Sequence, residues 1–186
     1  MAGLQDDEDL FAPVWRSVKN RWFWLAVNLG TAFVSSRVIG AFEHSIAQIV
    51  ALAALMPIVA GIGGNSGNQT ITMIVRALSS SNISNSQALA LLKKEIGVAL
   101  VNGLVWGGVM GLLSCVLYHS VGIGLVMVAA MTLNLLFAAI LGVLIPIGME
   151  KMGKDPALGS SVLITAFTDS GGFLIFLGLA TMFLLK

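Results

Sequence analysis

Charged residues are scarce in this chain of 186 residues, and cysteine is almost absent. Only 10% of the residues are charged, whereas soluble domains carry roughly 25%. Ten Lys and Arg nearly balance nine Asp and Glu and form no dense basic cluster, which excludes a nucleic-acid-binding surface. With 57% hydrophobic residues and a mean hydropathy of +0.94, the composition excludes a soluble domain and predicts a polytopic membrane protein.

The shortage of thiol and imidazole side chains limits the metal chemistry. Cys115 is the only cysteine, so the chain forms no intramolecular disulfide and no multi-thiolate metal site. We interpret Cys115 as a small packing residue. The two histidines, His44 and His119, stand at polar breaks between apolar runs, and we expect both at the outer surface of the membrane.

Long apolar runs make up most of the sequence. A membrane-spanning helix needs about 20 mainly apolar residues in succession. The chain offers five such runs, separated by short polar breaks: 22–42, 46–78, 96–117, 122–149 and 157–184. We therefore predict an all-α, polytopic membrane protein in which residues 22–186 form one pore domain of five transmembrane helices.

Residues 1–21 differ from these runs. An acidic stub is followed by apolar residues that recur every four positions, at Leu10, Val14, Val18 and Trp22. The pattern predicts an amphipathic interfacial helix that lies on the cytoplasmic surface of the membrane. A helix that couples the membrane domain to a soluble domain outside this chain fits the same pattern.

Basic residues indicate the orientation, because Lys and Arg are enriched in short cytoplasmic loops. With the N-terminus in the cytoplasm, the following all fall inside: Arg16, Lys19, Arg21, Arg76, Lys93, Lys94, Lys151 and Lys154. We therefore predict a multi-pass protein of the cell membrane with a cytoplasmic N-terminus and an external C-terminus.

The second run carries polar residues in its middle. Residues 57–69 read PIVAGIGGNSGNQ, and on a helix one face combines Gly61, Asn65, Asn68 and Thr72, with Gln69 beside them. The glycines leave room for amides and backbone carbonyls to approach a ligand. This face is therefore predicted to line a polar path.

Asp169 is the only carboxylate in the middle of the fifth run. An ionised side chain at the bilayer centre costs at least ~2.5–3.5 kcal/mol, so it is retained where it faces water or a bound ion. Small and polar residues recur around it at a spacing of three to four, namely Ser161, Thr165, Thr168 and Gly172. Counted from the cytoplasmic ends at ~1.5 Å per residue, Asp169 and Asn68 lie at a similar depth, so we predict that they share one site.

The predicted site offers oxygen ligands only. Carboxylate, amide, hydroxyl and carbonyl oxygens suit hard cations such as Mg²⁺, Ca²⁺ or Mn²⁺. Mg²⁺ fits the scarcity of charge, because it keeps several waters and needs few carboxylates. A single Asp is still few for a divalent ion, and a twofold homodimer would place two on one path. We therefore predict a homodimer with the site near its axis.

Some polar residues in the runs are predicted to serve packing instead. Amide side chains in membrane helices bond to neighbouring helices. Asn102 and Asn134, near the middle of the third and fourth runs, are expected to make such interhelical hydrogen bonds. Glu43 is either a solvated helix end or part of a mouth that attracts cations.

Four segments resemble the membrane domain of the MgtE-type magnesium channels. They are PIVAGIGGNSGNQTITMIVRAL at 57–78, KKEIGVALVNGLVWG at 93–107, EKMGKDPAL at 150–158 and TAFTDSGGFLIFLGLA at 165–180. The resemblance implies a dimeric, Mg²⁺-selective pore that is lined by the second and fifth runs and passes Mg²⁺ down its electrochemical gradient. Asp169 would be the principal metal-binding carboxylate, with Gly64, Asn68 and the Thr165 carbonyl contributing around a hydrated ion.

The wall of this pore is predicted to include seven further residues: Gly61, Asn65, Gln69, Thr72, Ser161, Thr168 and Gly172. In the family an Asn often occupies the place of Ser161. Family members also carry cytosolic regulatory domains, which are expected N-terminal to residue 1, and the acidic run at 6–9 is similar to the tail of the family's connecting helix. The chain is thus interpreted as an excised membrane domain, with a naturally short member as the alternative.

Two other functions fit parts of the sequence. Residues 64–67 read GNSG, the GxSG pattern of rhomboid-type intramembrane serine proteases, with Ser66 as the nucleophile. Both histidines are expected ~20 Å or more from Ser66 by helix rise, so no base reaches it, and we predict that the chain is not an enzyme. An alternating-access cation carrier would use the same site as a channel and remains the alternative.

Overall fold

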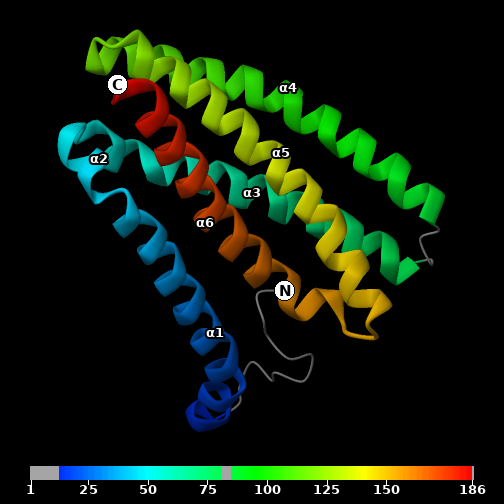
Figure 1. Cartoon of the computed structure of the whole chain (residues 1–186). Coiled ribbons are helices and arrows are strands. Elements are labelled where there is room, and N and C mark those ends of the chain that lie inside the picture. Colours follow the sequence, from blue (N-terminus) through cyan, green and yellow to red (C-terminus); the bar gives the residue numbers. More distant parts are fainter. Residues whose placement is uncertain (1–12, 81–84, 186) are drawn as a thin grey trace.

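The computed structural model describes residues 13–80 and 85–185 (Figure 1). Within these ranges the regular structure is helical and contains no strand, which confirms the all-α prediction. The helices are α1 (Val14–Ala41), α2 (Glu43–Gln48), α3 (Ala51–Ser80), α4 (Asn85–Tyr118), α5 (Val121–Lys151) and α6 (Pro156–Leu184).

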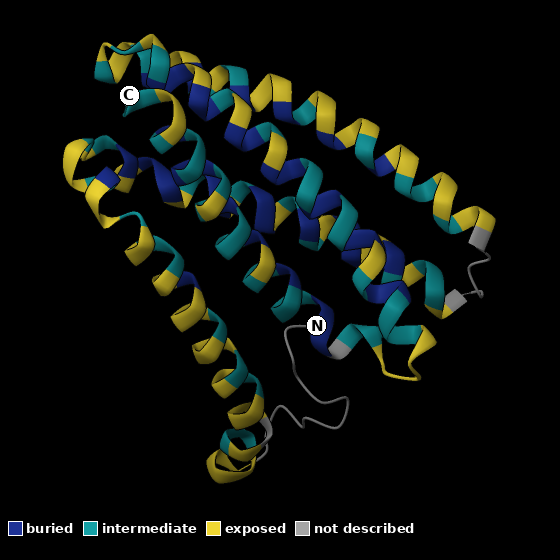
Figure 2. Ribbon diagram, viewed as in Figure 1, coloured by how far each residue is buried: buried dark blue, intermediate teal, exposed yellow. Residues whose placement is uncertain are grey.

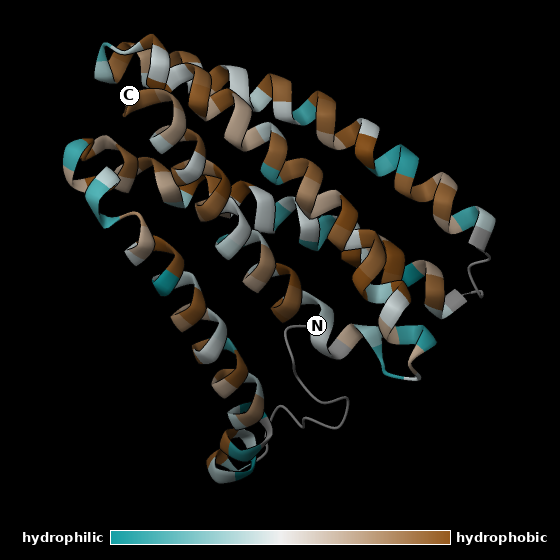
Figure 3. Cartoon of the chain, viewed as in Figure 1, coloured by the Kyte–Doolittle hydropathy of each residue, from teal (hydrophilic) through white to brown (hydrophobic). Residues whose placement is uncertain are grey.

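Four of these helices are long and apolar enough to cross a membrane: α1, α4, α5 and α6. Apolar residues run along most of their length, while hydrophilic residues gather towards the helix ends (Figure 3). The 30-residue α3 falls outside this group, because Asn65, Asn68 and Gln69 lower the hydropathy of its middle. The chain is therefore a multi-pass membrane protein, and a count of five spans stays a prediction that depends on α3.

The first helix differs from the predicted arrangement. Residues 14–21 continue without a break into the apolar stretch as part of the 28-residue α1, so the structure separates no interfacial helix from the first span. The interfacial helix is therefore not confirmed. Residues 1–12 of the predicted acidic stub lie outside the described residues.

The second predicted run also begins differently. The chain makes the short helix α2 at Glu43–Gln48, turns at Ile49 and Val50, and enters α3 at Ala51. From there α3 is one continuous helix that contains Pro57 and all four glycines of the polar segment. The glycines therefore do not break the helix. Gly63, Gly64 and Gly67 instead allow α5 and α6 to approach it closely.

The centre of the bundle is α5, against which α3, α4 and α6 all pack. Half of its most apolar stretch is buried, against 6% for α1, which contacts α6 and α2 (Figure 2). Glycines on α4 permit its close contact with α5: a Cβ at Gly103 would lie 2.7 Å from the Thr132 Cα, and one at Gly111 would lie 2.8 Å from the Gly124 carbonyl oxygen. Small residues at membrane helix contacts commonly act in this way.

Local signals fix the ends of the last two helices. The Ser120 side chain accepts a hydrogen bond from the Ile123 N–H and caps α5. Asp155 accepts one from the Ala157 N–H at 2.8 Å, and Pro156 then starts α6, where its fixed φ suits the first turn. The helix ends that carry most basic residues, from α1, α3, α4 and α5, lie at one end of the bundle (Figure 1).

A buried polar pair ties α3 to α4. The Thr70 hydroxyl donates to a Glu95 carboxylate oxygen at 2.9 Å, and both side chains are buried. The other Glu95 oxygen lies 3.8 Å from the exposed Lys94 ammonium. The Glu95 carboxylate thus has a buried partner in Thr70 and an exposed partner in Lys94, as a buried charge requires.

Replacing Thr70 with valine should destabilise the bundle. Valine keeps the shape but removes the donor to a buried carboxylate, and a hydrogen bond to a charged group contributes about 1.5–3 kcal/mol. Thermal unfolding in detergent should show a lower midpoint for Thr70→Val. Thr132→Val is the matched control, because the Thr132 hydroxyl donates only to the Val128 carbonyl of its own helix. Equal midpoints for the two variants would contradict this role.

Candidate cation site

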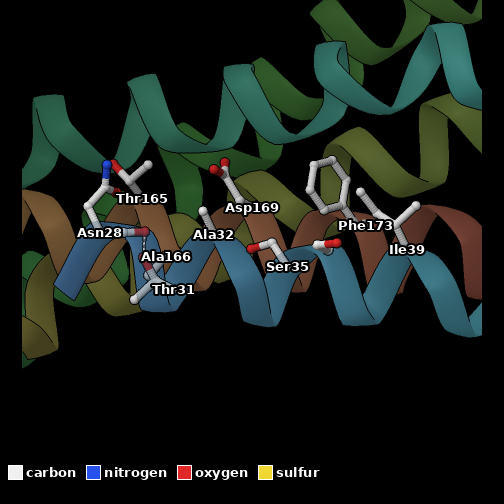
Figure 4. A pocket seen from close by; sticks show the side chains of 10 residues that line it. Asn28, Thr31, Ala32, Ser35, Ile39, Thr165, Ala166, Asp169 and Phe173 are labelled. Atoms are coloured by element: carbon white, nitrogen blue, oxygen red, sulfur yellow. Dashed lines mark hydrogen bonds between the residues drawn. The ribbon is translucent and has the colours of Figure 1, made fainter. Parts of the chain in front are cut away.

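Asp169 lies on α6 and faces a cavity between α1 and α6 that several polar side chains border (Figure 4). The cavity has a volume of about 260 Å³, and along α6 the carboxylate stands between Thr165 and Phe173. In the described part of the chain the Asp169 carboxylate has no hydrogen-bond or ion-pair partner. The residues around the cavity are Asn28, Thr31, Ala32, Ser35, Ser36, Ile39, Thr165, Ala166, Asp169 and Phe173.

A row of hydrogen bonds links α3 to the helix that carries Asp169. The Ser161 hydroxyl on α6 donates to the Asn68 side-chain oxygen on α3 at 2.7 Å. The Asn68 amide in turn donates to the Gly64 carbonyl at 3.0 Å. The Thr165 hydroxyl donates to the Ser161 carbonyl at 2.9 Å and also borders the Asp169 cavity. Four predicted residues, Gly64, Asn68, Ser161 and Thr165, are therefore linked to one another, and of these Thr165 borders the cavity that Asp169 faces.

The remaining predicted residues of α3 lie on its uncovered face. Gly61, Asn65, Gln69 and Thr72 are all exposed in the single chain, and no atom would lie within 4 Å of a Cβ built at Gly61. Asn65 and Gln69 border a second polar pocket, between α3 and α4, together with Ser66 and Asn102. Neither residue borders the cavity that Asp169 faces.

This second pocket bears on two sequence predictions. Asn102 lines the pocket, and no interhelical hydrogen bond of its side chain is seen among the described residues. Ser66 lies in the same pocket, whose lining contains no histidine or other base. The pocket therefore lacks the group that a serine protease needs.

Thr168 and Gly172 lie in packed protein in the single chain. Thr168 is fully buried, and its hydroxyl donates to the Ile164 carbonyl at 2.8 Å. A Cβ at Gly172 would meet the Asn134 amide of α5 and the Ala60 Cα of α3. Thr168 thus lies against Gly64 of α3, Gly172 packs against α3 and α5, and neither residue borders the cavity that Asp169 faces.

Asn134 joins three helices, which confirms the prediction that it forms an interhelical hydrogen bond. Its fully buried side chain on α5 donates from Nδ2 to the Val59 carbonyl of α3 at 2.8 Å. Gly63 on α3 and Gly172 on α6 leave the room for this amide. The Asn134 contact thus fixes where α3 lies relative to α6.

The cavity also contains polar residues that sequence reasoning missed. Asn28, Thr31, Ser35 and Ser36 on α1 face Asp169, and the Ser35 hydroxyl lies 2.8 Å from the Ser170 hydroxyl of α6. Their spacing of three, four and one is the signal that could have revealed a polar face on the first run.

The charge at the site comes from one carboxylate per chain. Among the described residues, no group of three or more His, Cys, Asp and Glu side chains lies together. One aspartate with amide, hydroxyl and carbonyl oxygens suits a hydrated hard cation, and a second carboxylate would have to come from another copy of the chain.

Comparison with known proteins agrees with this chemistry. The family model MgtE, described as a divalent cation transporter, matches residues 56–179. The chain is 32% identical to the magnesium transporter MgtE of Bacillus subtilis and 33% identical to that of Thermus thermophilus, in each case over 87% of its length. It is 29% identical to the magnesium transporter MgtE of Enterococcus faecalis over 99% of its length. The aligned regions cover only 36% to 40% of these relatives.

Proposed function

Because this chain belongs to the MgtE family of divalent cation transporters, we propose that it forms a membrane pore for Mg²⁺, which moves down its electrochemical gradient past Asp169. Membership of a transporter family agrees with the prediction that the chain is not an enzyme. The transported ion is the substrate of the site and not a resident cofactor.

One observation carries the proposal: among the described residues Asp169 is an unpartnered carboxylate in an apolar helix, and it faces a cavity that hydroxyl and amide side chains border. A charge in this position is stabilised by water or by a cation. The Coulomb attraction grows with the charge of the ion, which favours a divalent over a monovalent cation. The neutral oxygens of Asn68, Gly64 and Thr165 then hold the water shell without adding charge.

The linked row from Gly64 to Thr165 gives these oxygens fixed positions. Asn68 is held at both ends, by the Gly64 carbonyl and by the Ser161 hydroxyl. A held amide presents the same geometry to each ion, as octahedral Mg²⁺ demands more strictly than Ca²⁺. This rigidity supports Mg²⁺ as the preferred ion.

We further propose that two copies of the chain enclose the pore. The exposed face of α3, with Gly61, Asn65, Gln69 and Thr72, is polar where a lipid contact would be apolar. A second copy would cover part of this face and bring a second Asp169 to the path, so α3 and α6 of both copies would line it. Thr168 and Gly172 support the wall from behind by packing α6 on α3.

The proposed setting is the cell membrane, with the N-terminus in the cytoplasm. The basic helix ends at one end of the bundle support this orientation. Cytosolic regulatory domains that precede this segment are part of the same proposal, because the chain spans well under half of its relatives' length.

Flux measurements on the full chain in liposomes test the proposal. With Mg²⁺ outside and a Mg²⁺-sensitive dye inside, the dye signal should rise without added proton or Na⁺ gradients. Unitary current steps in planar bilayers should accompany it. Flux that strictly requires a proton or Na⁺ gradient would establish the carrier instead, and no Mg²⁺ flux under any gradient would refute both.

A further inference from the structure

We propose that α1 forms a third wall of the ion path, where Asn28 and Ser36 accept hydrogen bonds from the water shell of a Mg²⁺ ion bound at Asp169. The inference rests on the proposed function and adds residues from the first helix to a site otherwise made by α3 and α6. It assigns to them a role in the affinity and specificity for the hydrated ion.

The free hydrogen-bonding capacity of the cavity selects these two residues. The Ser35 hydroxyl is paired with Ser170, and the Thr31 hydroxyl donates to the Asn28 backbone carbonyl. The Asn28 amide and the Ser36 hydroxyl, by contrast, have no partner within the described residues. Asn28 and Ser36 are thus the polar side chains that α1 contributes to the cavity and that make no other hydrogen bond in the part of the chain that the structure describes.

The cavity is large enough for a hydrated ion. A volume of about 260 Å³ leaves room for Mg²⁺ with its shell of six waters. Because Mg²⁺ dehydrates reluctantly, we expect it to keep this shell beside Asp169. Contacts from α1 to the ion would therefore pass through water.

The water shell of Mg²⁺ donates hydrogen bonds, which neutral acceptors such as amide and hydroxyl oxygens can receive. Waters on Mg²⁺ point their hydrogens outward, so they donate to carboxylate, amide and hydroxyl oxygens. Asn28 and Ser36 are eight residues apart, about 12 Å along α1. The two acceptors would then hold the hydrated ion in turn as it passes Asp169, which lies on the facing helix.

Substitutions that remove these acceptors test the wall. The double variant Asn28→Leu, Ser36→Ala should raise the half-saturating Mg²⁺ concentration for flux about fivefold. The ion would contact the two acceptors in turn, so at each position it would lose one water-mediated hydrogen bond. Asn28→Asp should lower it, because a second carboxylate would face the same cavity. Leu29→Ala is the matched control, since Leu29 is 73% exposed and lies outside the cavity lining.

Cysteine protection gives a second readout that does not depend on flux. In a Cys115→Ala background, Asn28→Cys should react with a water-soluble thiol reagent, and Mg²⁺ should slow the reaction. Labelling that is equally fast with and without Mg²⁺ would overturn the inference. Absence of labelling would do the same, since it would mean that lipid or another copy covers the residue.

The outcomes separate this inference from the proposed function. If the double variant keeps the wild-type half-saturation while Asp169→Asn loses flux, the α1 wall is refuted and the pore stands. If Asp169→Asn also keeps its flux, the proposed function fails, and the inference fails with it.

Discussion

Asp169→Asn should reduce Mg²⁺ flux at least a hundredfold while leaving the fold intact. Asparagine keeps the shape of the side chain and removes its charge. Two unit charges 4 Å apart attract by about 4 kcal/mol at an effective dielectric constant of 20, and a divalent ion doubles that attraction. If intervening water reduces this attraction to a third, the remaining ~2.7 kcal/mol still corresponds to about two factors of ten. Dye-loaded liposomes with equal amounts of protein measure the loss.

Asp155→Asn is the control for this experiment. Asp155 caps the start of α6 and lies outside the cavity lining, and asparagine caps a helix as well as aspartate does. Its flux should equal that of the wild type. Retained flux in Asp169→Asn, with the thermal unfolding midpoint unchanged, would remove the carboxylate from the mechanism.

Gly67→Val should abolish most of the flux and also destabilise the bundle. A Cβ at Gly67 would lie 2.5 Å from the Cγ1 of Ile164 on α6, and Ile164 is fully buried, so it has no room to move away. Valine would push α3 from α6 and break the 2.7 Å bond between Ser161 and Asn68. Overpacking of this kind costs about 1–3 kcal/mol. We expect a lower unfolding midpoint and at least a tenfold loss of flux.

Gly97→Val separates packing from helix propensity. Both variants place valine in a membrane helix, but a Cβ at Gly97 on α4 would have no atom within 4 Å. Gly97→Val should therefore keep the wild-type midpoint and flux. If the two variants behave alike, the close approach of α3 and α6 at Gly67 is not what holds the site together.

The sequence identified candidate residues for the site because polar and charged side chains are costly in a membrane helix. Asp169 and Asn68 are costly in an apolar run, so their presence alone indicates a polar path. Helix rise predicted a common depth for Asn68 and Asp169, but the hydrogen bond that the Ser161 hydroxyl donates places Asn68 level with Ser161, eight residues or about 12 Å before Asp169 on α6. Their common site therefore stays a prediction. The all-α class was equally accessible, because apolar runs of this length form helices in a membrane.

Other features could not be derived from spacing. A stripe at intervals of three to four residues does not say which neighbouring helix it faces. In the structure Thr168 lies against α3, and Gly172 lies against α3 and α5. The hydroxyl residues of α1 carry no charge and cost little in a helix, so Ser35 and Ser36 gave no comparable signal. The continuity of α3 through its glycines depends on the helices packed against it, which the sequence does not specify.

The central claim is that a divalent cation lies between two Asp169 carboxylates in a dimer. A structure of the full chain in Mn²⁺ tests it most directly, because anomalous scattering locates that ion without ambiguity. We predict one Mn²⁺ peak on the twofold axis between the two Asp169 side chains, displaced by excess Mg²⁺ and missing in Asp169→Asn. Two Asp169 side chains that face lipid or packed protein, far from each other and with no ion between them, would contradict the account.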